Sequence, residues 1–151
     1  MSEANPIQLF VTHGWEESED YLRVFEFLES ARDFFYRNCS AVESRPQGDK
    51  EAIREALRAQ IRPAEIVIAL GSMVYQDAEQ LEFEMTFAQA VRKPVLLVPR
   101  FGKASVLPPK LTALATEIGE WDGRALVDAV RRLARGEATN RWDVIEFKLD
   151  E

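Results

Sequence analysis

Hydrophobic and polar positions along this chain follow two alternating periods. Short apolar runs typical of buried strands are separated by amphipathic segments with helical spacing. The runs predicted as strands are 7–14, 34–40, 65–71, 93–99 and 116–121, and the predicted helices cover 18–35, 50–64, 78–92 and 123–136. Alternating strands and helices favour a doubly wound α/β fold, a three-layer sandwich with about five parallel strands.

Several of these helices carry recognisable boundary residues. Ser18 is placed to cap the first helix, and Pro63 stops the second. Asp77 precedes the third helix, and Gln80 three residues later is expected to complete a capping box. Gly136 is a natural end for the last helix.

One carboxylate of the third helix has an unexpected position. At roughly 100° per residue, the stretch 81–90 has a broad apolar arc, with Glu82, Thr86 and Gln89 on the opposite side. Glu84 falls near the middle of the apolar arc. A carboxylate there loses hydration unless it faces a cleft or a partner. This conflict between residue type and position is typical of functional sites.

Composition limits the class of protein. The 151 residues suggest one domain over 1–151, with its core at about 7–135 and a tail at 136–151 that is either loosely docked or an added edge strand. A net charge of −7 argues against general binding to nucleic acid or anionic membranes. No apolar run reaches the length of a membrane span, and the N-terminus does not read as a secretion signal.

Cysteine and histidine are too scarce for several kinds of site. The single cysteine, Cys39, allows no internal disulfide and agrees with a cytoplasmic location. A structural zinc site is not expected, because the chain has only one cysteine and one histidine. No other metal ion is expected either.

The carboxyl ends of the predicted strands carry polar and aromatic side chains. Ligands of open parallel sheets bind beyond these ends. Glu84 lies in the second turn of the helix that follows the third strand, near the same edge. The residues expected around one cleft are Thr12, His13, Trp15, Asn38, Ser40, Ser72, Tyr75 and Glu84.

Each of these residues also has a purely structural interpretation. Glu84 could pair with an arginine or lysine, or cap a backbone group, and His13 could be a hydrogen-bonding loop residue. Trp15 could serve in packing, and Asn38 and Ser40 are common where strands end in turns.

Several familiar sites are excluded by missing motifs. The chain has no G-x-G-x-x-G, no phosphate loop of the form G-x-x-x-x-G-K-S/T and no G-x-S-x-G nucleophile elbow. Leu70-Gly71-Ser72 stands where a phosphoacceptor receiver would have an aspartate, and the acidic "THGWEESE" does not suit a flavodoxin phosphate loop.

The order of motifs resembles the bacterial TIR-like domain family, which includes the TIR protein of Thoeris anti-phage systems. The matching stretches, over residues 7–135, are "LFVTHGWEESEDY", "FFYRNCS", "LRAQIRPAEIVIALGSMVY", "LEFEMTFAQAVRKPVLLVP" and "EIGEWDGRALVDAVRR". The most specific are the "THGW" turn, "RNCS" and the helix-to-strand unit around "KP". The resemblance implies a flavodoxin-like sheet of five parallel strands.

The resemblance also implies an activity. A glutamate in the helix after the third strand is essential for NAD cleavage in catalytic TIR domains, and the matching residue is Glu84. The family often has a Ser-Trp or similar aromatic about one turn earlier. Here the stretch is "YQDAEQLEFE", which has no Trp, so that wall would come from Tyr75 or Phe83. Thr12, His13, Trp15, Asn38, Ser40 and Ser72 would help line the pocket. Arg100 or Lys103 would meet the diphosphate.

Besides some other nucleotide-processing enzyme, two functions remain open. One is a signalling enzyme in anti-phage defence, with NAD as substrate rather than cofactor, an ADP-ribose or cyclic ADP-ribose-type product, self-association and a downstream effector protein. The other is a non-catalytic adaptor or nucleotide-binding module that acts by self-association. The enzyme requires Glu84 to be accessible from a cleft near His13 or Trp15, whereas an adaptor tolerates Glu84 when it is paired or covered.

Overall fold

A computed structural model of the chain describes residues 1–103 and 106–136. The elements in chain order are β1 (Ile7–Val11), α1 (Glu19–Glu29), β2 (Tyr36–Asn38), α2 (Lys50–Ile61), β3 (Ile66–Leu70), the 3-10 helix η1 (Gly71–Tyr75), α3 (Ala78–Ala90), β4 (Val95–Val98), α4 (Pro109–Leu114), β5 (Glu117–Ile118) and α5 (Gly123–Arg135). Of the predicted tail at 136–151, residues 137–151 lie outside the described residues.

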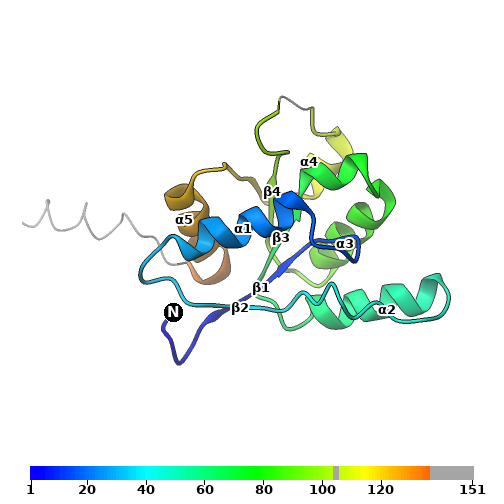
Figure 1. The fold of residues 1–151 in the computed structure, drawn as a ribbon, viewed down its shortest axis with the longest axis horizontal. Helices are drawn as coiled ribbons and strands as arrows, with labels where there is room; N and C mark the ends of the chain where they lie inside the picture. Colours follow the sequence, from blue (N-terminus) through cyan, green and yellow to red (C-terminus); the bar gives the residue numbers. More distant parts are fainter. Residues whose placement is uncertain (104–105, 137–151) are drawn as a thin grey trace, which may run out of the picture.

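All five described strands form one parallel sheet in the order β2-β1-β3-β4-β5. Helix α1 packs against α5, and α2 packs against α3, which also contacts α4. In Figure 1, α5 lies on one side of the view and α2 and α3 on the other. This three-layer α/β arrangement with its flavodoxin-like strand order confirms the fold class predicted from the sequence.

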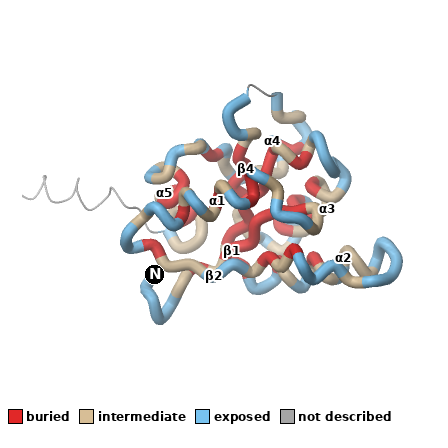
Figure 2. The backbone as a smooth tube through the Cα atoms, viewed as in Figure 1, coloured by how far each residue is buried: buried red, intermediate tan, exposed pale blue. Residues whose placement is uncertain are grey.

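The core lies in the central strands of the sheet. Every residue of β3 and of β4 is buried, as expected for parallel strands covered by helices on both faces. Figure 2 shows the buried positions gathered on the sheet and the inward sides of its helices. The carboxyl ends of β1, β3 and β4 therefore lie at the edge of a buried, closely packed part of the sheet.

The helix caps follow the sequence closely. Ser18 accepts from the Tyr21 N–H at 3.2 Å, Asp77 accepts from the Gln80 N–H at 3.1 Å, and Gly136 ends α5 in the left-handed conformation. The strands are shorter than predicted because the predicted ranges included flanking polar, glycine and proline residues, such as 12–14 after β1, that lie outside the paired strands. The elements η1 and α4 were not predicted, since each is only five or six residues long.

Candidate functional site

Glu84 is fully buried on α3, at the edge of the sheet where the chain leaves β1. Its Oε1 accepts a hydrogen bond from the backbone N–H of His13 at 3.2 Å, and its Oε2 accepts one from Gln80 Nε2 at 3.0 Å. Among the described residues, no lysine, arginine or histidine forms an ion pair with it. The structure thus places Glu84 beside His13, and covers it.

Burial dominates the chemistry of this carboxyl group. Loss of hydration raises the pKa of Glu84 well above its ordinary value, and the hydrogen bonds from Gln80 and His13 oppose that rise only in part. Asp77 raises the pKa further through its negative charge. Burial therefore disfavours the ionised form of Glu84 while it remains covered.

Gln80 does not complete the predicted capping box. Its side chain turns away from the Asp77 backbone, and Nε2 donates to both the His13 carbonyl oxygen and Glu84. The Asp77 N–H instead donates to the Met73 carbonyl at 2.8 Å. The capping-box prediction was wrong because the Gln80 side chain is held by two buried acceptors instead. One is the His13 carbonyl, which is distant in sequence, and the other is Glu84, one helical turn later.

The side chain of His13 is buried between two hydrogen-bond partners. Its Nδ1 accepts from the Trp15 backbone N–H at 3.1 Å, and its Nε2 lies 3.1 Å from Gln60 Oε1. The Gln60 amide is oriented by Ala41, whose N–H donates to the same Oε1 at 2.9 Å. Burial lowers the pKa of His13, although Gln60 and the charge of Glu43 oppose this effect. Both ring nitrogens are occupied, so His13 positions its neighbours.

Trp15 follows in the same turn and has a positive φ of 67°. Its ring meets the His13 ring edge-on at a centroid distance of 4.8 Å, and its Nε1 is buried with no hydrogen-bond partner among the described residues. A non-glycine residue in this conformation costs energy that the surrounding contacts must offset. A buried indole N–H without a partner among the described residues, on a ring that contacts His13, is a second feature that stability alone does not explain.

Asn38 and Ser40 form a compact polar cluster with Tyr21. The Tyr21 hydroxyl lies 2.8 Å from Ser40 Oγ and accepts from Asn38 Nδ2 at 3.1 Å, while Asn38 Oδ1 accepts from Ser40. The Tyr21 ring approaches that of His13 edge-on at 6.4 Å. Tyr21 is absent from the residues predicted for the site, and a tyrosine rather than a phenylalanine at this position was the available signal.

Thr12 has a structural role. Its Oγ1 accepts from the buried Leu70 N–H at 2.9 Å, where β1 and β3 end side by side. Tyr75 is 56% exposed, and the Arg100 guanidinium lies 4.7 Å above its ring. Neither residue contacts Glu84 through a hydrogen bond in the described structure.

A cleft of about 500 Å³ opens where η1, the start of α1 and the end of β4 meet. The lining residues are Glu16, Ser18, Glu19, Asp20, Arg23, Ser72, Gln76, Arg100, Phe101, Gly102 and Lys103. Ser72 Oγ is buried there, and the described part of the chain offers it no hydrogen-bond partner. Phe101 is held by its N–H, which donates to Asp20 Oδ2 at 3.1 Å, and by Arg23, 3.9 Å above its ring.

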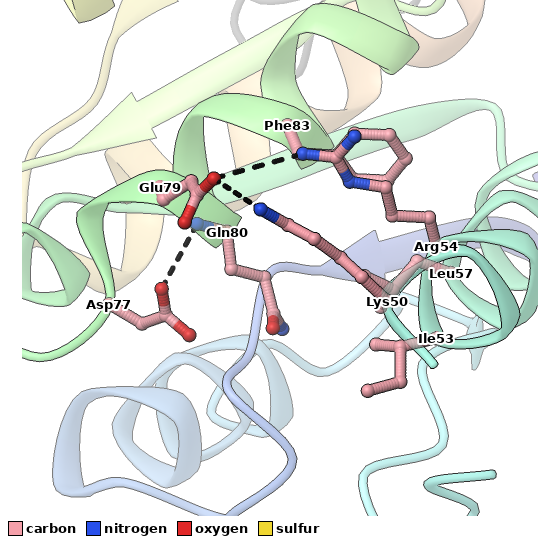
Figure 3. Close-up of a pocket in the computed structure, with 8 residues that line it drawn as sticks. All are labelled: Lys50, Ile53, Arg54, Leu57, Asp77, Glu79, Gln80 and Phe83. Atoms are coloured by element: carbon pink, nitrogen blue, oxygen red, sulfur yellow. Dashed lines mark hydrogen bonds and ion pairs between the residues drawn. The ribbon is translucent and has the colours of Figure 1, made fainter. Parts of the chain in front are cut away.

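A smaller cavity of about 120 Å³ lies between α2 and α3. Lys50, Ile53, Arg54, Leu57, Asp77, Glu79, Gln80 and Phe83 line it. Figure 3 shows Glu79 on α3 reaching Lys50 and Arg54 on α2, and Asp77 meeting the Gln80 backbone. Gln80 thus belongs both to this cavity and to the hydrogen bonds around Glu84. Sequence analysis assigned no role beyond helix capping to Gln80.

Residues 1–103 and 106–136 contain neither a candidate metal site nor a candidate membrane span. Within them, no three histidine, cysteine, aspartate or glutamate side chains are grouped so that they could hold a metal ion. None of the helices there combines the length and apolar character needed to cross a membrane.

Comparisons with known proteins add little to this site. No protein-family model matches the chain. No curated protein matches it either. One solved structure that it resembles is a 3-dehydroquinate dehydratase-like protein from Bifidobacterium longum, with 13% identity and a TM-score of 0.43. That match covers 89% of this chain and 96% of the other. A likeness this low carries no inference about function.

Proposed function

We propose that this protein binds NAD or a related nucleotide at the carboxyl edge of its sheet and cleaves the bond between nicotinamide and ribose. Glu84 is the catalytic residue of this proposal. The observation that carries it is a fully buried carboxyl group held by two N–H donors, with no cationic partner among the described residues. The choice of NAD cleavage as the reaction is supported by the resemblance to TIR-like domains.

A carboxyl group in this setting lowers the stability of the fold. Burying it costs free energy, and no described ion pair offsets that cost. Strongly shifted pKa values gather at functional sites, because catalysis requires groups that differ from their ordinary state in water. The two hydrogen bonds keep the carboxyl group pointed at the edge where parallel sheets bind ligands.

The proposed reaction needs one ionised carboxylate. The C–N bond breaks, both electrons leave with nicotinamide, and the neutral base departs. The positive charge that remains on the ribose is stabilised by Glu84. Water then adds and loses a proton, giving ADP-ribose, or the adenine of the same molecule attacks and gives a cyclic product. His13 holds Glu84 through its backbone N–H.

The cleft beside Ser72 is a suitable place for the diphosphate. Arg100 and Lys103 line it from the end of β4, and Arg23 lines it from α1. Its carboxylates Glu16 and Glu19 repel an anion, so the diphosphate would lie against the arginine and lysine side. The wider proposal adds a cytoplasmic location, self-association, a downstream effector protein and a role in anti-phage defence.

A non-catalytic adaptor is the second candidate function. It is favoured by the complete burial of Glu84, which in the described conformation leaves the carboxyl group out of reach of a ligand. In that case the nucleotide-binding edge would serve recognition or self-association, without turnover.

The test is a direct assay for nicotinamide. The purified protein, at high concentration and with a crowding agent, is incubated with NAD, and the products are separated by chromatography. Nicotinamide release that is lost in Glu84→Gln and kept in Glu82→Gln supports the enzyme. Glu82 is a suitable control because it lies two residues earlier on α3 and pairs with Lys110 at 2.9 Å. Absence of release under every assembly condition supports the adaptor.

A further inference from the structure

We infer that Gln80 is a displaceable cover over Glu84, and that a ligand reaches this carboxyl group through the cavity between α2 and α3. This inference rests on the proposed function, since it explains how a covered carboxyl group meets a substrate. It assigns a positioning role to Gln80 and an entrance to the site.

Gln80 lies at the contact between the cavity and the buried carboxyl group. Its side chain lines the cavity, while its Nε2 donates to Glu84 Oε2 and to the His13 carbonyl. Gln80 and Glu84 are four residues apart on one helix, so they lie on the same face of α3. Moving one amide would therefore connect Glu84 with the cavity and would not require α3 to unwind.

The outer wall of this cavity consists of polar contacts. Glu79 on α3 bonds Lys50 at 2.6 Å and lies 4.0 Å from Arg54, and the Lys50 and Glu79 side chains are 64% and 69% exposed. Exposed ion pairs contribute little to stability and are screened by salt. The Arg54 guanidinium also lies 4.8 Å from the centre of the Phe83 ring. Separating these ion pairs should therefore cost less free energy than separating an apolar contact of the same size.

The groups around the entrance suit a ligand that carries an aromatic ring. Phe83 presents a ring to the cavity, and Lys50 and Arg54 at its rim are paired with Glu79. Displacing Gln80 would free the His13 carbonyl and Glu84, the two acceptors that it now occupies. An amide on the ligand can donate to the same acceptors, so a ring carrying a carboxamide is the chemical class that replaces Gln80 best.

The cover is tested by chemical labelling of Glu84, which does not depend on turnover. The protein is treated with a water-soluble carbodiimide and an amine, and labelling of Glu84 is followed by peptide mass spectrometry. The variants are Gln80→Ala and the matched control Gln89→Ala, which removes an exposed glutamine from the same helix. Alanine favours helix, so Gln80→Ala is expected to fold. Gln80→Ser is a second variant that also cannot reach Glu84.

We expect the labelling rate of Glu84 to rise at least about tenfold in Gln80→Ala and Gln80→Ser, as the loss of two hydrogen bonds shifts the closed state toward the open one. Labelling in Gln89→Ala should equal that of the native chain. Equal labelling in all folded variants would overturn the cover. Increased labelling without nicotinamide release from any variant would keep the cover and overturn the NAD-cleaving function. Nicotinamide release with unchanged labelling would keep the NAD-cleaving function and overturn the cover.

Discussion

The imidazole Nδ1 of His13 accepts a hydrogen bond from the backbone N–H of Trp15 at 3.1 Å. The proton of the neutral ring must then be on Nε2, where it donates to Gln60 Oε1. Ala41 donates to that same Oε1, which confirms the oxygen as the acceptor. One tautomer of His13 therefore joins the turn after β1 to α2.

This relationship predicts the nuclear magnetic resonance signature of His13. Because it is the only histidine of the chain, its long-range 1H–15N spectrum needs no assignment by mutation. We expect a protonated Nε2 and an unprotonated Nδ1 at pH 7, with titration below the ordinary pKa of about 6.5 because burial disfavours the charged ring. Titration at or above 6.5, or the opposite tautomer, would contradict the geometry.

The raised pKa of Glu84 predicts a pH-dependent effect of Glu84→Gln on stability. Between the unfolded pKa of about 4.3 and the higher folded pKa, the folded protein binds more protons, so the Glu84 contribution to stability falls as pH rises. Glutamine does not titrate. We therefore expect the free energy of unfolding of Glu84→Gln, relative to the native chain, to increase over this window.

Urea unfolding at several pH values measures this difference. His13 is present in both proteins, so its own titration cancels from the comparison. Glu82→Gln, which removes an ion-paired carboxylate from the same helix, controls for the loss of one charge. A constant destabilisation by Glu84→Gln at every pH would mean that its carboxyl group is an ordinary structural hydrogen-bond acceptor.

Thr12→Val should destabilise the protein although it conserves the shape of the side chain. The Thr12 hydroxyl is the acceptor for the buried Leu70 N–H, and valine leaves that donor unsatisfied. The expected loss in the free energy of unfolding is about 1–3 kcal/mol. Thr12→Ser keeps the hydroxyl and should lose less. If serine and valine prove equally destabilising, the lost methyl packing matters more than the hydrogen bond.

Arg135→Lys should weaken the contact between the end of α5 and the start of β3. Arg135 Nε and Nη2 donate to the two Glu65 oxygens at 2.6 and 2.9 Å, and Nη2 also donates to the Pro6 carbonyl. Lysine keeps the charge but cannot reproduce this fork. We expect a loss of about 1 kcal/mol in urea unfolding at neutral pH.

The effect of Arg135→Lys should shrink in acid. Arg135 is the main cause of the lowered pKa of Glu65, so the stability that Glu65 contributes is present above about 4.3 and is lost as pH falls through its folded pKa. A mutational effect that stays the same at neutral pH and at pH 3 would assign the loss to the backbone contacts of Arg135.

The strand and helix pattern was readable from the sequence because it depends on local spacing. Ser18, Asp77 and Gly136 mark helix ends in the structure as they do in the sequence, since a cap involves residues only a few positions apart. The short helix α4 was not predicted, because six residues are too few to show a helical hydrophobic period.

The partners of the buried groups depended on contacts between distant segments. Helical spacing alone placed Glu84 on an apolar face, but its hydrogen bond to the His13 backbone joins residues 71 positions apart. The same tertiary contact took Gln80 away from its local role as a capping residue, because a buried carbonyl and a buried carboxyl group had to be satisfied. Local spacing therefore determined the elements and the unusual position of Glu84. Only the tertiary contact between the turn that follows β1 and helix α3 decided what that carboxyl group contacts.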